Sequence, residues 1–82
     1  MNPAEVKSFL LRSLLRGGAQ PLSTLGAAVR LAFPSTPLPD GDTQAQIREL
    51  ETAGFVTGTR DDFLGEVWAL TEPKGRLRAQ QL

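Results

Sequence analysis

The chain has 82 residues, with nine basic and nine acidic side chains that give a formal net charge of zero at pH 7. This length leaves room for a single domain, which we expect to span residues 1–82. Neither cysteine nor histidine occurs, which excludes disulfides and removes the usual zinc ligands, so we expect no metal site. No apolar run approaches the roughly 20 residues that cross a bilayer, and no long apolar signal segment opens the chain, so we expect a cytoplasmic protein without membrane contact.

A first helix is predicted over residues 3–16. Asn2 is a good N-cap residue, and Glu5 places its charge at the positive end of the helix. Gly17 and Gly18 provide the stop. One face of this helix is apolar and consists of Val6, Phe9, Leu10 and Leu14. Leu11 and Leu15 widen that face enough for either a dimer interface or a larger core.

A short strand and a second helix are expected next. Residues 20–22 allow only a stub of strand, and Ser23 is a plausible cap for a helix over residues 24–33. The apolar residues of this helix recur at helical spacing: Leu25, Ala28, Val29 and Ala32. The following segment, PSTPLPDG at residues 34–41, is rich in proline and is expected to be an extended loop.

A third helix is predicted over residues 43–53, with Asp42 as its cap and Gly54 as its stop. On a helical wheel its inward side consists of Ile47, Leu50 and Ala53. The outward side consists of Ala45, Arg48, Glu49 and Thr52, flanked by Gln44 and Gln46.

A β-hairpin and a final short helix complete the prediction. Residues 55–59 (FVTGT) and 66–70 (EVWAL) are rich in strand-forming residues, and RDDFLG between them has turn chemistry. Thr71 is expected to cap the last helix, with Pro73 in its first turn and Leu77 folded back onto the body.

Two joins between these elements share a pattern of apolar residues and glycines: Leu50, Gly54, Phe55 and Val56 after the third helix, and Leu70, Thr71, Gly75 and Arg76 after the hairpin. Both joins resemble those of the winged helix-turn-helix superfamily of small bacterial regulators. The resemblance implies an α+β fold with a three-helix core, a two-stranded β-hairpin wing and a short C-terminal helix. Because winged helices also serve as protein-docking modules, it leaves the function open.

Double-stranded DNA is the partner that the resemblance implies. In that family the third helix enters the major groove and the wing contacts the adjacent backbone. Arg48 could then read guanine and Gln44 adenine, although a merely solvated helix face would look similar. The implied DNA-binding residues are Gln44, Ala45, Arg48 and Thr52, with Arg60 in the wing tip at residues 60–64.

Charge distribution is the main objection to DNA binding. Residues 42–66 contain six acidic and two basic residues, a local charge of minus four, and the rest of the chain carries plus four. DNA-binding surfaces usually show the reverse. Two accounts of this asymmetry remain. In the first, Glu49 and Glu51 pair with Arg48 or with basic residues of the first two helices, and the acids of the wing point away from DNA. In the second, this acidic region contacts a basic protein surface, including that of a second subunit.

A protein partner would use apolar residues of the hairpin. Phe63 and Leu64 fall at the predicted turn, where they are either an exposed docking point or folded back and buried. Trp68, the only tryptophan, either closes the core against the first or third helix or serves as an exposed anchor.

Enzymatic function finds no support in the sequence. Asp61 and Asp62 are adjacent on a loop, no histidine or cysteine nucleophile exists, and RGGAQ lacks the spacing of a phosphate loop, so we expect no catalytic residue and no cofactor. We therefore expect a dimeric DNA-binding protein, either a small transcriptional regulator or an accessory subunit of a DNA-handling complex. The alternative is a protein-interaction module that uses the acidic third helix and the wing tip without binding DNA.

Overall fold

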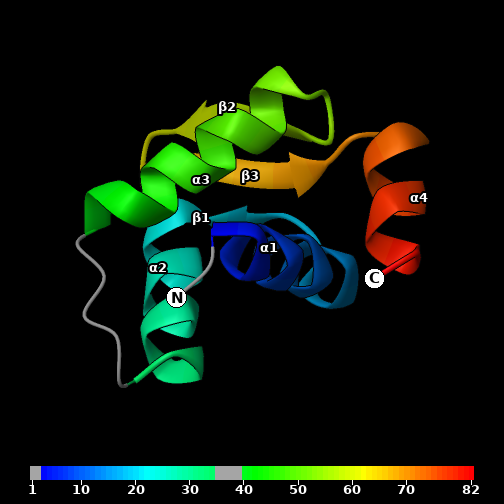
Figure 1. Cartoon of the computed structure of the whole chain (residues 1–82). Helices are drawn as coiled ribbons and strands as arrows, with labels where there is room; N and C mark the ends of the chain where they lie inside the picture. The colour runs from blue at the N-terminus through cyan, green and yellow to red at the C-terminus, as the bar shows by residue number, and fades with distance from the viewer. Residues whose placement is uncertain (1–2, 35–39) are drawn as a thin grey trace.

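Four helices and three antiparallel strands make up the computed structural model, which describes residues 3–34 and 40–82 (Figure 1). The α+β class expected from the sequence is confirmed. The elements follow the predicted order: α1 (Pro3–Gly17), β1 (Gln20–Pro21), α2 (Leu22–Ala32), α3 (Asp40–Thr52), β2 (Val56–Asp61), β3 (Gly65–Leu70) and α4 (Lys74–Gln80). Within the described residues, no helix is both long and apolar enough to cross a membrane.

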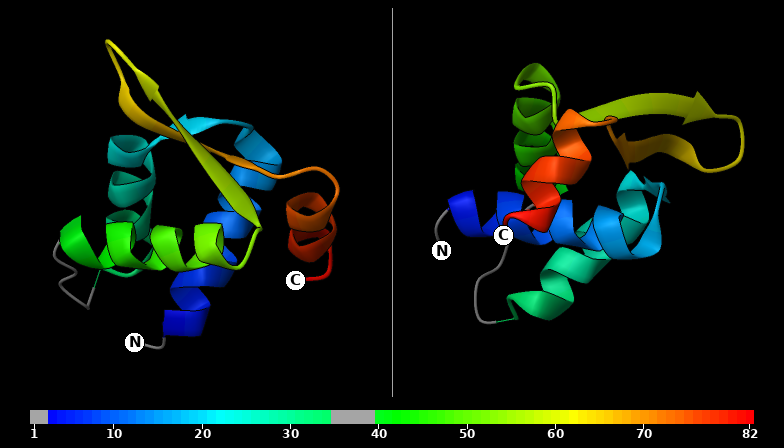
Figure 2. Two further views of the ribbon diagram at one scale, coloured as in Figure 1. Left: turned by 90° about the horizontal axis from the view of Figure 1, so that it is seen from above. Right: turned by 90° about the vertical axis from the view of Figure 1, so that its right-hand side faces the viewer.

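The sheet has the order β1-β3-β2, so β3 lies at its centre. The stub β1 pairs Gln20 with Trp68, and β2 pairs Gly58 with the same Trp68 from the other side. Proline has no N–H to donate to a neighbouring strand, and Pro21 is tolerated because β1 is an edge strand. The β2–β3 hairpin is longer than predicted, and its tip projects beyond the helices (Figure 2).

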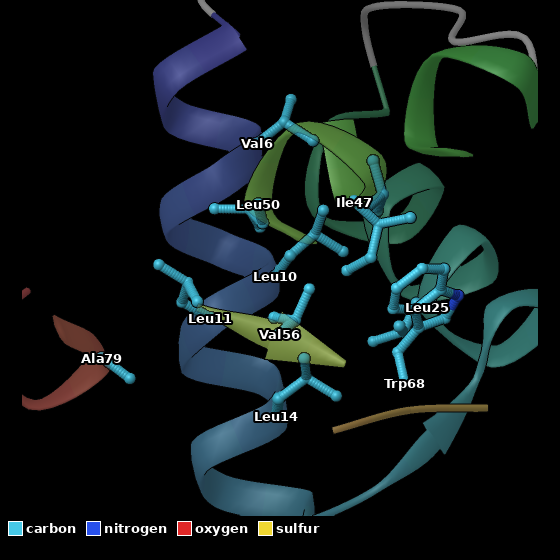
Figure 3. Packing of buried hydrophobic residues seen from close by; sticks show 11 residues of the cluster. Val6, Leu10, Leu11, Leu14, Leu25, Ile47, Leu50, Val56, Trp68 and Ala79 are labelled. Carbon is cyan, nitrogen blue, oxygen red and sulfur yellow. The ribbon is translucent and has the colours of Figure 1, made fainter. Parts of the chain in front are cut away.

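One hydrophobic cluster is built from all four helices and the two long strands (Figure 3). Leu11 is among its buried members, which supports the larger-core interpretation of the wide apolar face of α1. The predicted inward residues Ile47 and Leu50 are confirmed. The complete cluster is Val6, Leu10, Leu11, Leu14, Leu25, Val29, Ile47, Leu50, Val56, Trp68 and Ala79.

The two joins that carry the family resemblance meet in space. Thr71 donates its hydroxyl to the Gly54 carbonyl oxygen at 2.7 Å and accepts the Gly75 N–H at 3.0 Å. Lys74 donates to the Ala53 carbonyl oxygen at 2.6 Å, and its ammonium lies 5.1 Å from the ring centroid of Phe55. Lys74 therefore satisfies a carbonyl at the C-terminal end of α3, where the helix dipole favours a cation. These motif residues connect α3 to α4.

Several predicted helix starts are wrong by a few residues. The third helix begins at Asp40, so Asp42 lies inside it rather than at its cap, and the last part of the predicted loop 34–41 is helical. The second helix begins at Leu22, and its N-cap is Pro21 in an extended conformation (φ −65°, ψ 151°), so Ser23 is not the cap. The proposed cap Asn2 lies outside the described residues.

Two residues predicted to point inward are exposed instead. Ala53 lies beyond the end of α3, at a turn that Gly54 makes with φ 88°. In α4 the buried residues are Gly75 and Ala79, one helical turn apart, so α4 packs with its small residues inward. Leu77 lies between them in sequence and is therefore turned outward, with 54% of its surface exposed.

Candidate functional site

The outer face of α3 carries the residues predicted to contact DNA. Ala45, Arg48 and Thr52 are exposed, and Gln44 is half-buried on the side that faces the hairpin. The Thr52 hydroxyl donates to the Arg48 carbonyl oxygen at 3.1 Å, so its donor is used within the helix. Arg60 is exposed on β2. All five predicted residues thus have side chains outside the core.

Two of these five residues donate to one carboxylate, that of Glu66 on β3, and a third, Arg60, lies opposite Glu66 in the hairpin. Arg48 Nη2 donates to Glu66 Oε1 at 3.1 Å, and Gln44 Nε2 donates to Glu66 Oε2 at 3.5 Å. Arg60 is directly opposite Glu66 in the β2–β3 register, and residues opposite each other in antiparallel strands share a face of the sheet. This arrangement was missed from the sequence, because Arg60 was assigned to the turn of the predicted hairpin and Glu66 was counted only as an unfavourable acid.

The convergence lies in a shallow hollow between α3 and the hairpin, which we call the α3–hairpin corner. Its volume is about 220 Å³ and its lining residues are Arg48, Glu51, Gly58, Thr59, Arg60, Glu66 and Trp68. Two arginines and two glutamates balance each other in this lining, so the corner has no excess charge. A ligand entering it must compete with contacts that the protein already makes.

Trp68 forms the floor of the corner and is 2% exposed. The interpretation of Trp68 as an exposed partner anchor is therefore wrong, and the core interpretation is confirmed. The physical reason is Gly58, its register partner, because a Cβ on Gly58 would come within 2.9 Å of the indole ring. Only a residue without a side chain leaves room for the ring at this position.

The hairpin tip is a tight turn held by Asp61. Its Oδ1 accepts the N–H groups of Phe63 and Leu64 at 2.8 and 3.0 Å, and these hydrogen bonds lower the pKa of the Asp61 carboxyl from its ordinary value. Gly65 completes the turn with φ 77°. Phe63 is 96% exposed and Leu64 56% exposed, so the interpretation that the loop folds back and buries them is wrong.

Some of the acids counted against DNA binding have local partners. Glu49 forms an ion pair with Lys7 of α1 at 3.3 Å, as one of the two charge accounts expects. Arg48 pairs with Glu66 of the hairpin, however, and with neither Glu49 nor Glu51. Asp61 is occupied by the backbone of its own turn. Asp62 and Glu51 remain exposed on this side of the molecule.

A larger hollow of about 540 Å³ opens beside the first turns of α1 and contains none of the predicted site residues; its lining residues are Ala4, Glu5, Ser8, Arg12, Phe33 and Leu82. Among residues 3–34 and 40–82, no three acidic side chains form a group that could hold a metal ion.

Comparison of the chain with protein-family models, with curated proteins and with solved structures gives no match in any of the three.

Proposed function

We propose that the chain is a winged helix-turn-helix protein that binds double-stranded DNA through α3 and the β2–β3 hairpin. The order of helices and strands supports this assignment, with α3 as the recognition helix and the hairpin as the wing. The observation that carries the proposal is that Arg48 and Arg60 line one exposed corner between helix and hairpin, with Gln44 beside it in contact with Glu66. A regulator or accessory subunit of this kind would act in the cytoplasm, and a homodimer would present two such helices to DNA.

The corner has the chemistry of a base-reading surface. Arg48 carries several N–H donors and gives one of them to Glu66, so others are available for the O6 and N7 atoms of guanine. Ala45, on the outer face, is small enough to let the helix backbone approach the groove and can contact a thymine methyl group. Arg60 on the hairpin is placed for a phosphate oxygen.

The acidic residues limit how strong such binding can be. Asp62 and Glu51 are exposed near the same surface and repel phosphates, and few basic residues offset them. We therefore expect a shallow salt dependence, with the logarithm of the affinity falling by about 0.9 per phosphate contact for each unit of log salt concentration.

The test is fluorescence anisotropy of the protein with arbitrary duplex DNA over a range of salt concentrations. Binding at low salt that weakens as salt rises supports the proposal. Replacing Arg48 with alanine should weaken specific binding by about 1 to 3 kcal/mol without lowering the melting temperature. Absence of binding by the wild-type protein at low salt would refute the proposal.

A specific observation favours a second function, docking to a protein partner through the hairpin tip. Phe63 and Leu64 are exposed on a turn whose backbone is held by Asp61, so these apolar side chains are presented by an ordered structure. Large exposed apolar groups are characteristic of interaction sites. Protein that binds no DNA at low salt would favour this alternative, in which Phe63→Ala should abolish partner binding and Arg48→Ala should not.

A further inference from the structure

We propose that Glu66 is the residue that sets sequence specificity, because it orients both Arg48 and Gln44 toward the bases. This inference rests on the proposed DNA-binding function. It assigns Glu66 a positioning role, since its carboxylate accepts from two side chains of α3. One of the six acids counted against DNA binding would then be required for DNA reading.

The geometry uses both oxygens of the carboxylate. Oε1 accepts from Arg48 and Oε2 accepts from Gln44, at 3.1 and 3.5 Å. Gln44 and Arg48 are one helical turn apart on α3, so they are neighbours on its surface. A single carboxylate therefore contacts two adjacent side chains, through a hydrogen bond to Arg48 and a long one to Gln44.

The exposed fractions of the two side chains agree with a position of Glu66 beneath Arg48. The Arg48 side chain is 54% exposed, whereas that of Glu66 is 33% exposed. Glu66 is also two residues from the buried Trp68 on the same strand, and alternate residues of a strand share a face. Glu66 thus projects from the core-facing side of β3, and Arg48 is the more exposed of the two partners.

Orientation matters because base reading is bidentate. An arginine or glutamine must present two groups at once to a base edge, and ordering a free side chain for this purpose costs binding free energy. A side chain that Glu66 already holds has lost part of that freedom before DNA arrives. The gain applies only at the correct base, so it appears as discrimination between sequences and not as general affinity.

Glu51 provides a matched control within the same corner. It lines the same hollow and carries the same charge, but it forms no hydrogen bond or ion pair with Arg48 or Gln44 in the described part of the chain. Glu51→Gln removes a negative charge and leaves the bridge intact. Glu66→Asp does the opposite, because it keeps the charge and shortens the side chain that reaches the two donors.

The experiment begins with selection of a preferred duplex by the wild-type protein from a random-sequence pool. Affinities of wild type, Glu66→Gln, Glu66→Asp and Glu51→Gln are then measured for that duplex and for a scrambled duplex of equal length. We expect both Glu66 variants to lose about tenfold or more of the preference for the selected duplex. Glu51→Gln should keep the preference, and both glutamine variants should bind the scrambled duplex slightly more tightly.

Three results would overturn the inference. If the two Glu66 variants kept the same preference as Glu51→Gln, Glu66 would not set specificity. A wild-type protein that binds duplexes without selecting any sequence would leave DNA binding intact and remove the specificity role. A wild-type protein that binds no duplex at low salt would remove the proposed function and this role together. Melting temperatures of all variants verify folding, and exposed ion pairs of this kind contribute so little stability that we expect no large shift.

Discussion

Trp68 on β3 lies against Gly58, its register partner on β2, so closely that a Cβ on Gly58 would stand 2.9 Å from the indole ring. This contact attaches the hairpin to the core near the point where the hairpin extends beyond the helices. It also places Glu66, two residues before Trp68, against α3. The candidate site therefore depends on a packing contact beneath it.

Gly58→Ala should destabilise the protein by about 1 to 3 kcal/mol, because the added methyl group overpacks the ring. Gly26→Ala is the matched control. Gly26 lies in α2 with no atom within 4 Å of an added Cβ, and alanine in a helix interior is favoured over glycine by about 0.5 to 1 kcal/mol. Chemical denaturation should thus show shifts of opposite sign, and equal shifts would contradict the packing of Trp68 on Gly58.

Leu50→Ala should cost about 2 to 5 kcal/mol of stability, because Leu50 is 4% exposed and belongs to the cluster that holds α3. Leu31→Ala makes the same chemical change at a residue that is 82% exposed, and its effect should stay within about 0.5 kcal/mol. Thermal melts measure both. An unchanged melting temperature for Leu50→Ala would mean that α3 is not anchored as described.

Gly75→Ala should be among the most damaging alanine substitutions in the chain. A Cβ at this position would collide with the carbonyl oxygen of Phe55, a backbone atom that cannot move aside as a side chain can. Overpacking of this kind costs about 1 to 3 kcal/mol and occasionally more. Soluble expression and circular dichroism provide the measurement, and a variant as stable as wild type would show that α4 is free to shift away from the hairpin.

The hairpin tip should respond to acid through Asp61. Because its pKa is lowered in the folded state, the carboxylate stabilises the tip above the ordinary pKa, and that contribution is lost as pH falls through the lowered value. An NMR titration should therefore place the Asp61 midpoint below the ordinary value of 3.8. The amide protons of Phe63 and Leu64 should move with the same midpoint. A midpoint at or above 3.8 would contradict the hydrogen bonds.

The helices could be predicted from the sequence because their determinants are local. Glycine at Gly18 and Gly54 ends α1 and α3, and the apolar spacing correctly places Ile47 and Leu50 inside. The error at Leu77 arose because an apolar residue was assumed to point inward. The buried side of α4 is decided instead by how closely it must approach its neighbours, which favours Gly75 and Ala79.

The candidate site was predicted only in part. The outward direction of Arg48 follows from the helical wheel alone. Its contact with Glu66 does not, because that contact depends on how the hairpin lies against α3, and residues 48 and 66 are brought together only by the tertiary fold. For Trp68, the choice between core and anchor depended on recognising that Gly58 would be its partner across the hairpin.

The central claim, that DNA meets α3 and the hairpin, is tested most directly by following the backbone amide signals of the isotope-labelled protein as duplex DNA is added. The account predicts that shifts concentrate in residues 44–52 and 59–66, and that Arg48→Ala reduces them. Shifts confined to α1 and α4, where most of the other basic residues lie, would contradict it. A spectrum that DNA leaves unchanged at low salt would contradict it equally.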